Sequence, residues 1–198
     1  MNLFYIMGKS STGKDTIYKK ITEKIDIEEY VSYTTRPMRD EEKDGREYHF
    51  ISEDKMNMYK QQGSMIECRT YQTVHGPWMY ATINDEQFHK TGNMITVGTL
   101  ESYQKIKKYL DENKTNIRLY PIYLQISEEL RRDRAIQREN KQKNPDFKEM
   151  ERRLEADNID FADENLKKCG INEKNTFLNI DLSECVTYIE EYIKKFQL

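Results

Sequence analysis

A stretch close to the start of the chain combines residue types that bind phosphate groups. Residues 8–15 read Gly-Lys-Ser-Ser-Thr-Gly-Lys-Asp, so a glycine and four further residues precede the pair Gly13 and Lys14. Glycines at this spacing let a loop turn tightly enough for several backbone N–H groups to face one anion, while the lysine reaches the outer phosphates. We therefore predict a phosphate loop at residues 8–15.

The segments on either side of this loop favour the same interpretation. Residues 3–7 form an apolar run typical of a buried strand, and Ile17, Ile21 and Ile25 recur at helical spacing after the loop. The N-terminus of that helix would direct its partial positive charge at a bound phosphate. Spacing, strand and helix together favour a phosphate site over a glycine-rich turn that merely caps a helix.

One position in the loop departs from the common pattern of such loops. Asp15 follows the lysine, where a serine or threonine usually supplies a hydroxyl to magnesium. A carboxylate is also a hard oxygen ligand of the kind that Mg²⁺ accepts. We therefore predict that Asp15 is a metal ligand.

Composition narrows the class of protein. The 198 residues suit one domain, and 36% hydrophobic against 34% charged residues indicates a heavily charged surface around one core. A net charge of -3 gives no basic field for nucleic acid, and no apolar run approaches the roughly 20 residues of a membrane helix. The three cysteines are scattered, which indicates reduced thiols and no zinc site. With no charged leader before the first strand, we expect a cytoplasmic protein without nucleic-acid or membrane partners.

Strands and helices are predicted to alternate along most of the chain, which indicates an α/β fold with a parallel sheet. After residues 3–7, the expected strands are 30–33, 65–66, 78–82, 94–97, 119–126 and 177–180. The expected helices after the first are 52–63, 85–90, 101–110, a basic segment from 131, 147–168 and 185–196. Pro121 makes the strand 119–126 unlikely to be central over its full length. Residues 71–77 are expected to be a loop, and the strand-rich segment 34–84 is interpreted as an inserted substrate-binding subdomain.

A second motif follows the strand expected at 30–33. It consists of Thr34, Thr35, Arg36, Arg39, Glu42, Gly45, Tyr48 and Phe50. Together with the phosphate loop, this motif resembles guanylate kinases, most strongly over residues 1–51. The resemblance implies a single P-loop kinase domain over 1–198 with a central parallel sheet. Its parts would be a core at 1–33, 85–126 and 147–198, a GMP-binding subdomain at 34–84 and an arginine-rich lid at 127–146.

The resemblance also implies an activity and a set of site residues. The activity is the magnesium- and ATP-dependent phosphorylation of GMP to GDP, with dGMP left open as a further acceptor. The ATP-binding residues would be Gly8, Ser10, Ser11, Thr12, Gly13, Lys14, Asp15, Thr16 and Asn179. The GMP-binding residues would be Arg36, Arg39, Tyr48 and Tyr80 at the phosphate, and Ser32, Glu67 and Thr82 at guanine. The catalytic residues would be Lys14, Arg138 and Arg153, with Arg134 in reserve.

Elementary chemistry supports part of this assignment. Two arginine forks suit a phosphate monoester, and the Glu67 carboxylate matches the N1–H and N2 amino donors of guanine. The competing interpretation of Glu67 is a strand-end acid on the surface. In the basic segment, acidic residues interleave with the arginines, so the pattern alone favours a solvated helix face, and only the resemblance makes it a lid.

The sequence also departs from the resemblance and leaves alternatives open. Residues 95–99 read Ile-Thr-Val-Gly-Thr, where the family usually carries acidic residues, and the segment from Glu67 to Tyr80 is longer than expected. One alternative is a kinase for another nucleoside monophosphate or a ribosyl bisphosphate. A second is a non-catalytic binding module. A monomer and a homodimer are both compatible with the sequence.

Overall fold

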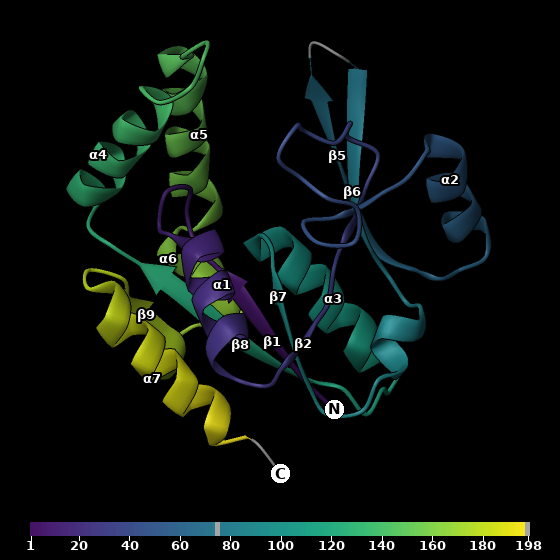
Figure 1. The fold of residues 1–198 in the computed structure, drawn as a ribbon. Coiled ribbons are helices and arrows are strands. Elements are labelled where there is room, and N and C mark those ends of the chain that lie inside the picture. Colours follow the sequence, from purple (N-terminus) through teal and green to yellow (C-terminus); the bar gives the residue numbers. More distant parts are fainter. Residues whose placement is uncertain (74–75, 197–198) are drawn as a thin grey trace.

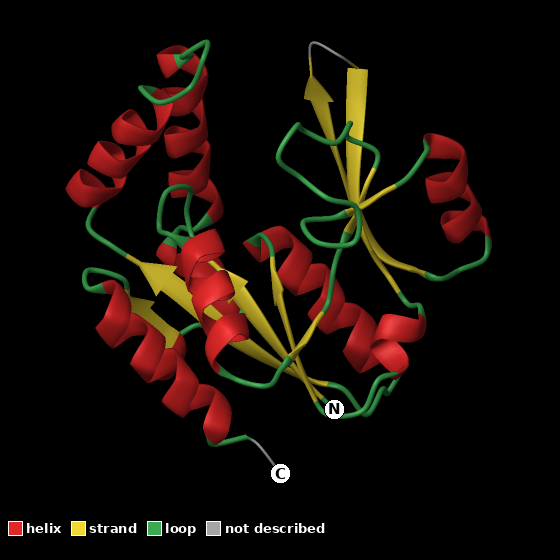
Figure 2. Ribbon diagram, viewed as in Figure 1, coloured by secondary structure: helices red, strands yellow, loops and turns green. Residues whose placement is uncertain are grey.

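The computed structural model describes residues 1–73 and 76–196 and contains two β-sheets with helices around them (Figures 1 and 2). The larger sheet has the strand order β2-β7-β1-β8-β9, and all its pairings are parallel. Its strands are β1 (Asn2–Met7), β2 (Glu28–Glu29), β7 (Asn93–Val97), β8 (Arg118–Gln125) and β9 (Thr176–Leu178). This arrangement confirms the predicted α/β class with a central parallel sheet.

Helices cover both faces of the central sheet because its strands are apolar on both sides. In β1, Leu3, Tyr5 and Met7 point to the face covered by α3, whereas Phe4 and Ile6 point to the face covered by α1 and α7. The covering helices are α1 (Lys14–Lys24), α3 (Leu100–Glu112), α6 (Asp163–Lys168) and α7 (Leu182–Lys194). Since β1 is buried throughout, the loop that follows it starts from a rigid position at the carboxyl end of the sheet.

The smaller sheet has the order β4-β3-β6-β5 and stands beside the central one (Figure 1). Its strands are β3 (Tyr33–Thr34), β4 (His49–Phe50), β5 (Met65–Thr73) and β6 (Gly76–Ile83). Helix α2 (Glu53–Gln61) packs on it through Met56, and the Ser52 hydroxyl caps the helix by accepting a bond from the N–H of Lys55. The 3₁₀ segment Glu86–His89, shorter than the expected helix, leads back to the central sheet.

Two further helices, α4 (Glu128–Glu139) and α5 (Phe147–Asp160), extend from the carboxyl end of the central sheet (Figure 1). They contact each other through a small apolar cluster of Ala135, Met150 and Leu154. The remaining 3₁₀ segment is Glu173–Asn175, and all three cysteines are free thiols, as predicted. No helix among residues 1–73 and 76–196 has the length and apolar character needed to cross a membrane.

The strand predicted at 30–33 is wrong as a single element. Residues 28–29 pair in the central sheet as β2, whereas Tyr33 begins β3 in the smaller sheet. The chain changes sheets at Tyr30, whose hydroxyl donates to the carbonyl of Ile83 at 3.0 Å. Local alternation of apolar residues identifies extended backbone, but it carries no information on which sheet the backbone joins.

The predicted loop at 71–77 is also wrong in most of its length. Strand β5 continues to Thr73 and β6 begins at Gly76, while residues 74–75 lie outside the described residues. Cross-strand aromatic contacts extend the hairpin, since the rings of Tyr71 and Tyr80 lie 5.6 Å apart in an edge-to-face arrangement. This longer hairpin accounts for the extra residues between Glu67 and Tyr80.

The long helix predicted at 147–168 is two helices. Helix α5 ends at Asp160 and α6 begins at Asp163, with Phe161 between them. The Phe161 ring is buried and stacks on Tyr123 at 5.7 Å, which requires the chain to turn at that point. The expectation for Pro121 is confirmed, because β9 pairs with β8 only from Tyr123 onward.

Candidate functional site

The glycines of the phosphate loop are required by close contacts. Gly13 has φ 90°, in the left-handed region, and a Cβ there would lie 2.5 Å from the side-chain nitrogen of Asn179. That Asn179 nitrogen donates to the carbonyl of Thr12 at 2.8 Å. A Cβ on Gly8 would lie 2.6 Å from the carbonyl oxygen of Leu124. The loop is therefore held tightly between α1 and the ends of β8 and β9.

The N–H groups of this loop are available to an anion. Gly13 caps α1 without any side-chain bond, and the backbone N–H groups of residues 11 and 13–16 have no hydrogen-bond partner within residues 1–73 and 76–196. Unpaired N–H groups at a helix N-terminus attract negative charge. The loop geometry therefore matches the predicted phosphate site.

Lys14 lies over this loop. Its ammonium group donates to the carbonyl oxygens of Gly8 at 2.9 Å and Lys9 at 3.1 Å. Burial lowers the pKa of Lys14; the carboxylates of Asp15 and Asp157 oppose this effect, and the nearby arginine charges add to it. The lysine is thus partly desolvated and close to other cations. An anionic ligand would stabilise its charged form in this environment.

A cavity of about 380 Å³ joins the phosphate loop to helices α4 and α5. It is lined by Ser10, Ser11, Gly13, Lys14, Asp15, Thr16, Arg134, Ala135, Arg138, Glu139, Met150, Arg153 and Leu154. The cavity therefore brings together Lys14, Asp15 and the three candidate arginines, which are far apart in the sequence. Arg138 forms no ion pair among the described residues, and Arg153 has only long ones, 3.8 Å to Glu139 and 3.9 Å to Glu149.

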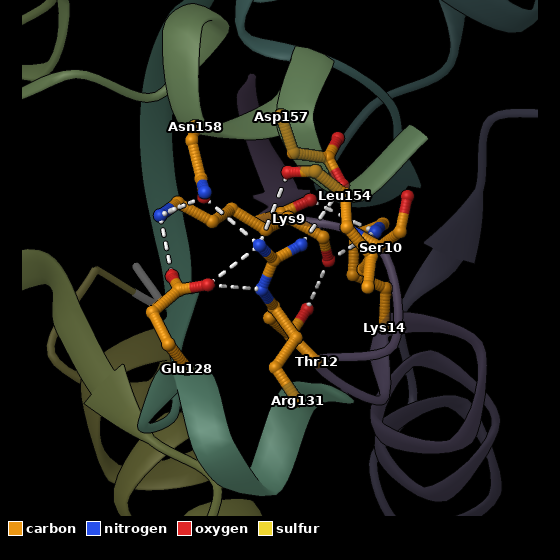
Figure 3. Close-up of polar contacts among 10 residues, drawn as sticks. Lys9, Ser10, Thr12, Lys14, Glu128, Arg131, Leu154, Asp157 and Asn158 are labelled. Atoms are coloured by element: carbon orange, nitrogen blue, oxygen red, sulfur yellow. Dashed lines mark hydrogen bonds and ion pairs between the residues drawn. The ribbon is translucent and has the colours of Figure 1, made fainter. Parts of the chain in front are cut away.

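Arg131 ties the phosphate loop to helices α4 and α5, the segment predicted to include the lid (Figure 3). Its guanidinium pairs with Glu128 at 2.6 Å and Asp157 at 3.2 Å, and Asp157 also accepts from the N–H of Ser10 at 2.7 Å. Lys9 completes the cluster by pairing with the same Glu128 at 2.6 Å. We call Lys9, Glu128, Arg131, Asp157 and Asn158 the loop-lid cluster.

The sequence pattern failed to identify this cluster. A solvated helix face is wrong for Arg131, which is 2% exposed, although it holds for Arg132, whose side chain is 58% exposed. Arg131, Ala135 and Glu139 follow one another at intervals of four residues and form the buried face of α4. The apolar pair Ala135 and Ile136, in a helix whose other residues are mostly charged, was the available signal.

Asn179 and Arg134 lie beside Gly13 of the loop. The Arg134 guanidinium donates to the carbonyl of Asn179 at 3.0 Å. The side-chain oxygen of Asn179 is buried and has no hydrogen-bond partner among the described residues. A buried acceptor without a partner is costly unless a ligand or water satisfies it.

The second motif places Arg36 in an aromatic environment. Arg36 is buried, forms a bidentate ion pair with Glu42 at 2.7 and 3.0 Å, and lies 5.7 Å from the ring centre of Tyr48 and 5.5 Å from that of Phe50. The Arg36 bond holds the pKa of the Glu42 carboxyl below its ordinary value. Arg39 is exposed, and its guanidinium forms no ion pair within the described part of the chain.

The remaining predicted acceptor residues lie on one face of the β5–β6 hairpin. Glu67 pairs in register with Thr82, and Arg69 pairs with Tyr80. Residues directly opposite each other in a sheet project to the same side, and alternate residues of one strand share that side. We call Glu67, Arg69, Tyr80 and Thr82 the hairpin face. Ser32 precedes β3, and the Tyr80 ring meets the Tyr48 ring at 5.5 Å.

Glu67 is not the surface acid of the competing interpretation, because it is 4% exposed. One carboxylate oxygen accepts from the hydroxyls of Thr82 at 2.9 Å and Ser102 at 2.8 Å, and the other accepts from Arg69 Nε at 3.1 Å. Arg69 and Ser102 were not predicted. Arg69 lies two residues after Glu67 and would have been recognised as a neighbour if the strand had been extended beyond Ile66.

The backbone after Met94, where residues 95–99 include no acid, is packed tightly against Tyr5. A Cβ built on Gly98 would overlap the Tyr5 hydroxyl, so no acidic side chain fits there beside this tyrosine. Tyr5 donates to the carbonyl of Thr99 at 3.3 Å. The backbone just after β7 therefore lies against the Tyr5 hydroxyl of β1 and leaves no room for a side chain at residue 98.

The donor set near the loop suits a magnesium ion that is shared with a nucleotide. Asp15 is exposed in the first turn of α1 and lines the cavity. Within residues 1–73 and 76–196 there is no group of three or more His, Cys, Asp or Glu residues arranged to hold a metal. Mg²⁺ in phosphoryl-transfer sites typically uses one or two carboxylates together with substrate phosphates and water. A single carboxylate beside a phosphate loop fits that requirement.

Comparison with known proteins adds an independent result. The family model described as guanylate kinase matches residues 1–168. The guanylate kinase of Tropheryma whipplei (strain Twist) is 29% identical over 125 residues, which are 61% of this chain and 63%, less than two thirds, of that protein. The guanylate kinase of Porphyromonas gingivalis is 26% identical over 98% of this chain and 97% of its own length. The crystal structure of guanylate kinase from Anaplasma phagocytophilum has the same fold, with a TM-score of 0.63 at 19% identity, over 100% of this chain and 87% of its own.

Proposed function

The chain belongs to the guanylate kinase family, and from that premise we propose that it transfers the terminal phosphoryl group of ATP to GMP. The observation that carries the proposal is the cavity in which unpaired loop N–H groups and Lys14 face Arg138 and Arg153. The site combines a helix N-terminus, a lysine, and two arginines that have only long ion pairs or none among the described residues. This concentration of positive charge suits a triphosphate.

On the donor side, the triphosphate would lie along the loop with Lys14 turned from the loop carbonyls toward the outer phosphates. Arg138 and Arg153 would approach the transferred group from the lid, which we assign to residues 127–146 together with the start of α5. The negative charge would also relieve the crowding of cations around Lys14. Phosphoryl transfer spreads charge over the moving group, so fixed cations at this place lower its barrier.

The adenine base would lie beside Asn179. Its unpartnered side-chain oxygen suits an amino group, and Arg134 is bonded to the Asn179 backbone. We therefore assign Arg134 to the adenine side of the donor site, and Arg138 and Arg153 to the phosphates.

Asp15 would hold magnesium together with the donor phosphates. When bound there, the ion would neutralise charge on the phosphates. The carboxylate replaces the usual hydroxyl ligand; the other acid that lines the cavity, Glu139, lies 3.8 Å from Arg153.

On the acceptor side, the smaller sheet would bind GMP as an inserted subdomain of residues 34–84. Arg36, Arg39, Tyr48 and Tyr80 would bind the phosphate, and Ser32, Glu67 and Thr82 would bind guanine. The Tyr48 ring lies 5.7 Å from the Arg36 guanidinium and 5.5 Å from the Tyr80 ring, and burial raises the pKa of its phenol. These contacts group three of the four proposed phosphate-binding residues.

The attacking group is an oxygen of the acceptor phosphate, which is already deprotonated near neutral pH. The transfer then needs orientation, charge compensation and exclusion of water, and no general base. Closure of α4 and α5 over the loop would supply the last of these and limit ATP hydrolysis.

An acceptor panel tests the proposal. Release of ADP is measured with GMP, dGMP, AMP, CMP, UMP and ribose 1,5-bisphosphate at equal concentrations with magnesium and ATP. We expect turnover with GMP to exceed that with AMP, CMP, UMP and the bisphosphate. Equal or greater turnover with any of these four would overturn the guanine assignment, and no turnover with any acceptor would favour a binding module.

A further inference from the structure

Arg69 occupies the centre of the hairpin face. It lies directly across from Tyr80 and two residues from Glu67 on the same strand, so its side chain projects to the side of the hairpin that carries both. Three of the four members of this face have assigned acceptor roles, two at the base and one at the phosphate. Arg69 lies between these two groups and has none.

The Arg69 guanidinium is fixed by two bonds and leaves one nitrogen free. Nε donates to the Glu67 carboxylate at 3.1 Å and Nη1 donates to the Thr99 hydroxyl at 3.0 Å. Nη2 has no hydrogen-bond partner among residues 1–73 and 76–196, and it is not a buried unsatisfied atom. The side chain is only 11% exposed and projects from the face of the hairpin that carries Glu67 and Tyr80, so its free nitrogen belongs to that face.

The surroundings of this free edge suit an anion. Burial opposes the charge of Arg69, but the adjacent Glu67 carboxylate raises the pKa of Arg69 above its ordinary value, so the group stays charged. The Arg36 guanidinium lies 5.7 Å from the centre of the Tyr48 ring, and this ring meets that of Tyr80, the residue opposite Arg69, at 5.5 Å. Both terminal nitrogens of Arg36 are already bonded to Glu42, whereas Nη2 of Arg69 has no partner among the described residues.

We propose that Arg69 is a further acceptor-binding residue, whose Nη2 donates to the phosphate of the nucleoside monophosphate while its Nε holds Glu67 toward the base. This inference rests on the proposed function for the identity of the acceptor. One side chain then links the two parts of acceptor recognition. A ligand without a phosphate loses the contact to Arg69. A ligand with another base cannot make the matching hydrogen bonds to Glu67, which Arg69 helps to position.

Binding of a nucleotide and of its nucleoside separates the two roles. Dissociation constants for GMP and for guanosine, which keeps base and sugar but has no phosphate, are measured by calorimetry on the wild type and on Arg69→Met. We expect the variant to weaken GMP binding roughly 10- to 100-fold, as for loss of a charged hydrogen bond. Guanosine binding is expected to weaken by a clearly smaller factor, because that ligand loses only the positioning of Glu67 and not the contact to the phosphate.

Two further variants make the test decisive. Arg69→Gln removes the charge but keeps a donor for Glu67, so it serves if the methionine variant unfolds, and the same selective loss of GMP affinity is expected. Arg118→Met removes an exposed arginine at the amino end of β8, remote from the site, and should change neither constant. An equal loss for GMP and guanosine would mean that Arg69 acts only through Glu67, and no loss for either would mean no acceptor role; both results overturn the proposal.

Failure of the proposed function gives a different result. If the wild type binds and phosphorylates another monophosphate in place of GMP, the same comparison is made with that nucleotide and its nucleoside. A loss restricted to the nucleotide then supports the role of Arg69 although the guanine assignment has failed.

Discussion

The phosphate loop and the hairpin face are the two halves of the proposed site, and they are built in opposite ways. The loop is one continuous stretch whose proposed ligand groups are backbone N–H groups, and those of residues 11 and 13–16 have no partner in the described part of the chain. The hairpin face and the neighbouring Arg36 use side chains from three separate segments. Each charged side chain there already has a partner, Arg36 with Glu42 and Glu67 with Arg69.

This difference bears on what each half needs from the rest of the molecule. The loop needs a rigid frame, which β1, α1 and the loop-lid cluster provide. The acceptor side needs neutral ion pairs that keep its charges oriented in the absence of substrate, since a buried unpaired charge is strongly destabilising. We therefore expect changes on the donor side to affect the frame and the chemical step, and changes on the acceptor side to affect affinity and pH response.

The largest effect is expected for Arg131→Met, which removes the centre of the loop-lid cluster. Arg131 is 2% exposed, and its loss leaves Glu128 and Asp157 without their shared cation. We expect the free energy of unfolding, measured with urea, to fall by about 3–5 kcal/mol. The matched control is Arg132→Met on the exposed side of the same helix, for which we expect less than about 1 kcal/mol. Similar small losses for both variants would show that the cluster does not support the loop.

The next effect is the loss of catalysis in Lys14→Met. We expect kcat to fall roughly 100- to 1000-fold, because the charge that Lys14 provides is needed most in the transition state. Steady-state ADP release measures the effect, and Lys19→Met, on the exposed side of α1, is the control that should retain activity. Unchanged turnover and nucleotide affinity in Lys14→Met would remove the enzyme interpretation and favour a binding module.

The same contrast explains which parts of the site were predictable from the sequence. The loop was found because its chemistry depends on glycine spacing between a strand and a helix, which are local properties. Arg69, Ser102 and Asp157 were missed because each acts through a contact with a distant segment. Asp157 reaches the N–H of Ser10 from 147 positions away, and no local pattern reports such a pair.

The fold was predictable to a similar extent and for similar reasons. The central strands and their covering helices follow from runs of apolar residues and helical spacing. The change of sheet at Tyr30 and the turn at Phe161 depend on where those aromatic side chains are buried. The extended hairpin is stabilised by contacts across its two strands, such as that between the rings of Tyr71 and Tyr80, so its polar residues were assigned to a loop.

A smaller effect is expected for Asp15→Ala, which tests the donor side through its metal. The variant loses the carboxylate that we assign to magnesium. We expect the Mg²⁺ concentration at half-maximal rate to rise about tenfold, with part of the rate recovered at high magnesium. Asp26→Ala, at the other end of α1, should leave this concentration unchanged. An unaltered magnesium response in Asp15→Ala would exclude Asp15 as a ligand.

The smallest effect is expected for Glu42→Gln, which tests whether the acceptor side depends on its internal ion pairs. The bond from Arg36 keeps the pKa of Glu42 in the folded protein below the ordinary value of 4.5. A lowered pKa in the folded state stabilises the fold above that ordinary value, and the contribution disappears as the pH falls through the folded-state pKa. We therefore expect Glu42→Gln to lower the free energy of unfolding by about 1 kcal/mol at pH 7.

The pH dependence distinguishes this loss from a general disturbance of the loop. The difference between wild type and Glu42→Gln should shrink as the pH is lowered below 4.5, because the wild-type carboxyl then becomes neutral as well. Glu47→Gln is the matched control, since Glu47 pairs with the exposed Arg46 and should contribute less than about 0.5 kcal/mol. If the difference for Glu42→Gln were the same at pH 7 and pH 3.5, its ion pair would not be what stabilises Arg36. The contrast between a paired acceptor side and an unpaired phosphate loop would then hold only for Glu67 and Arg69.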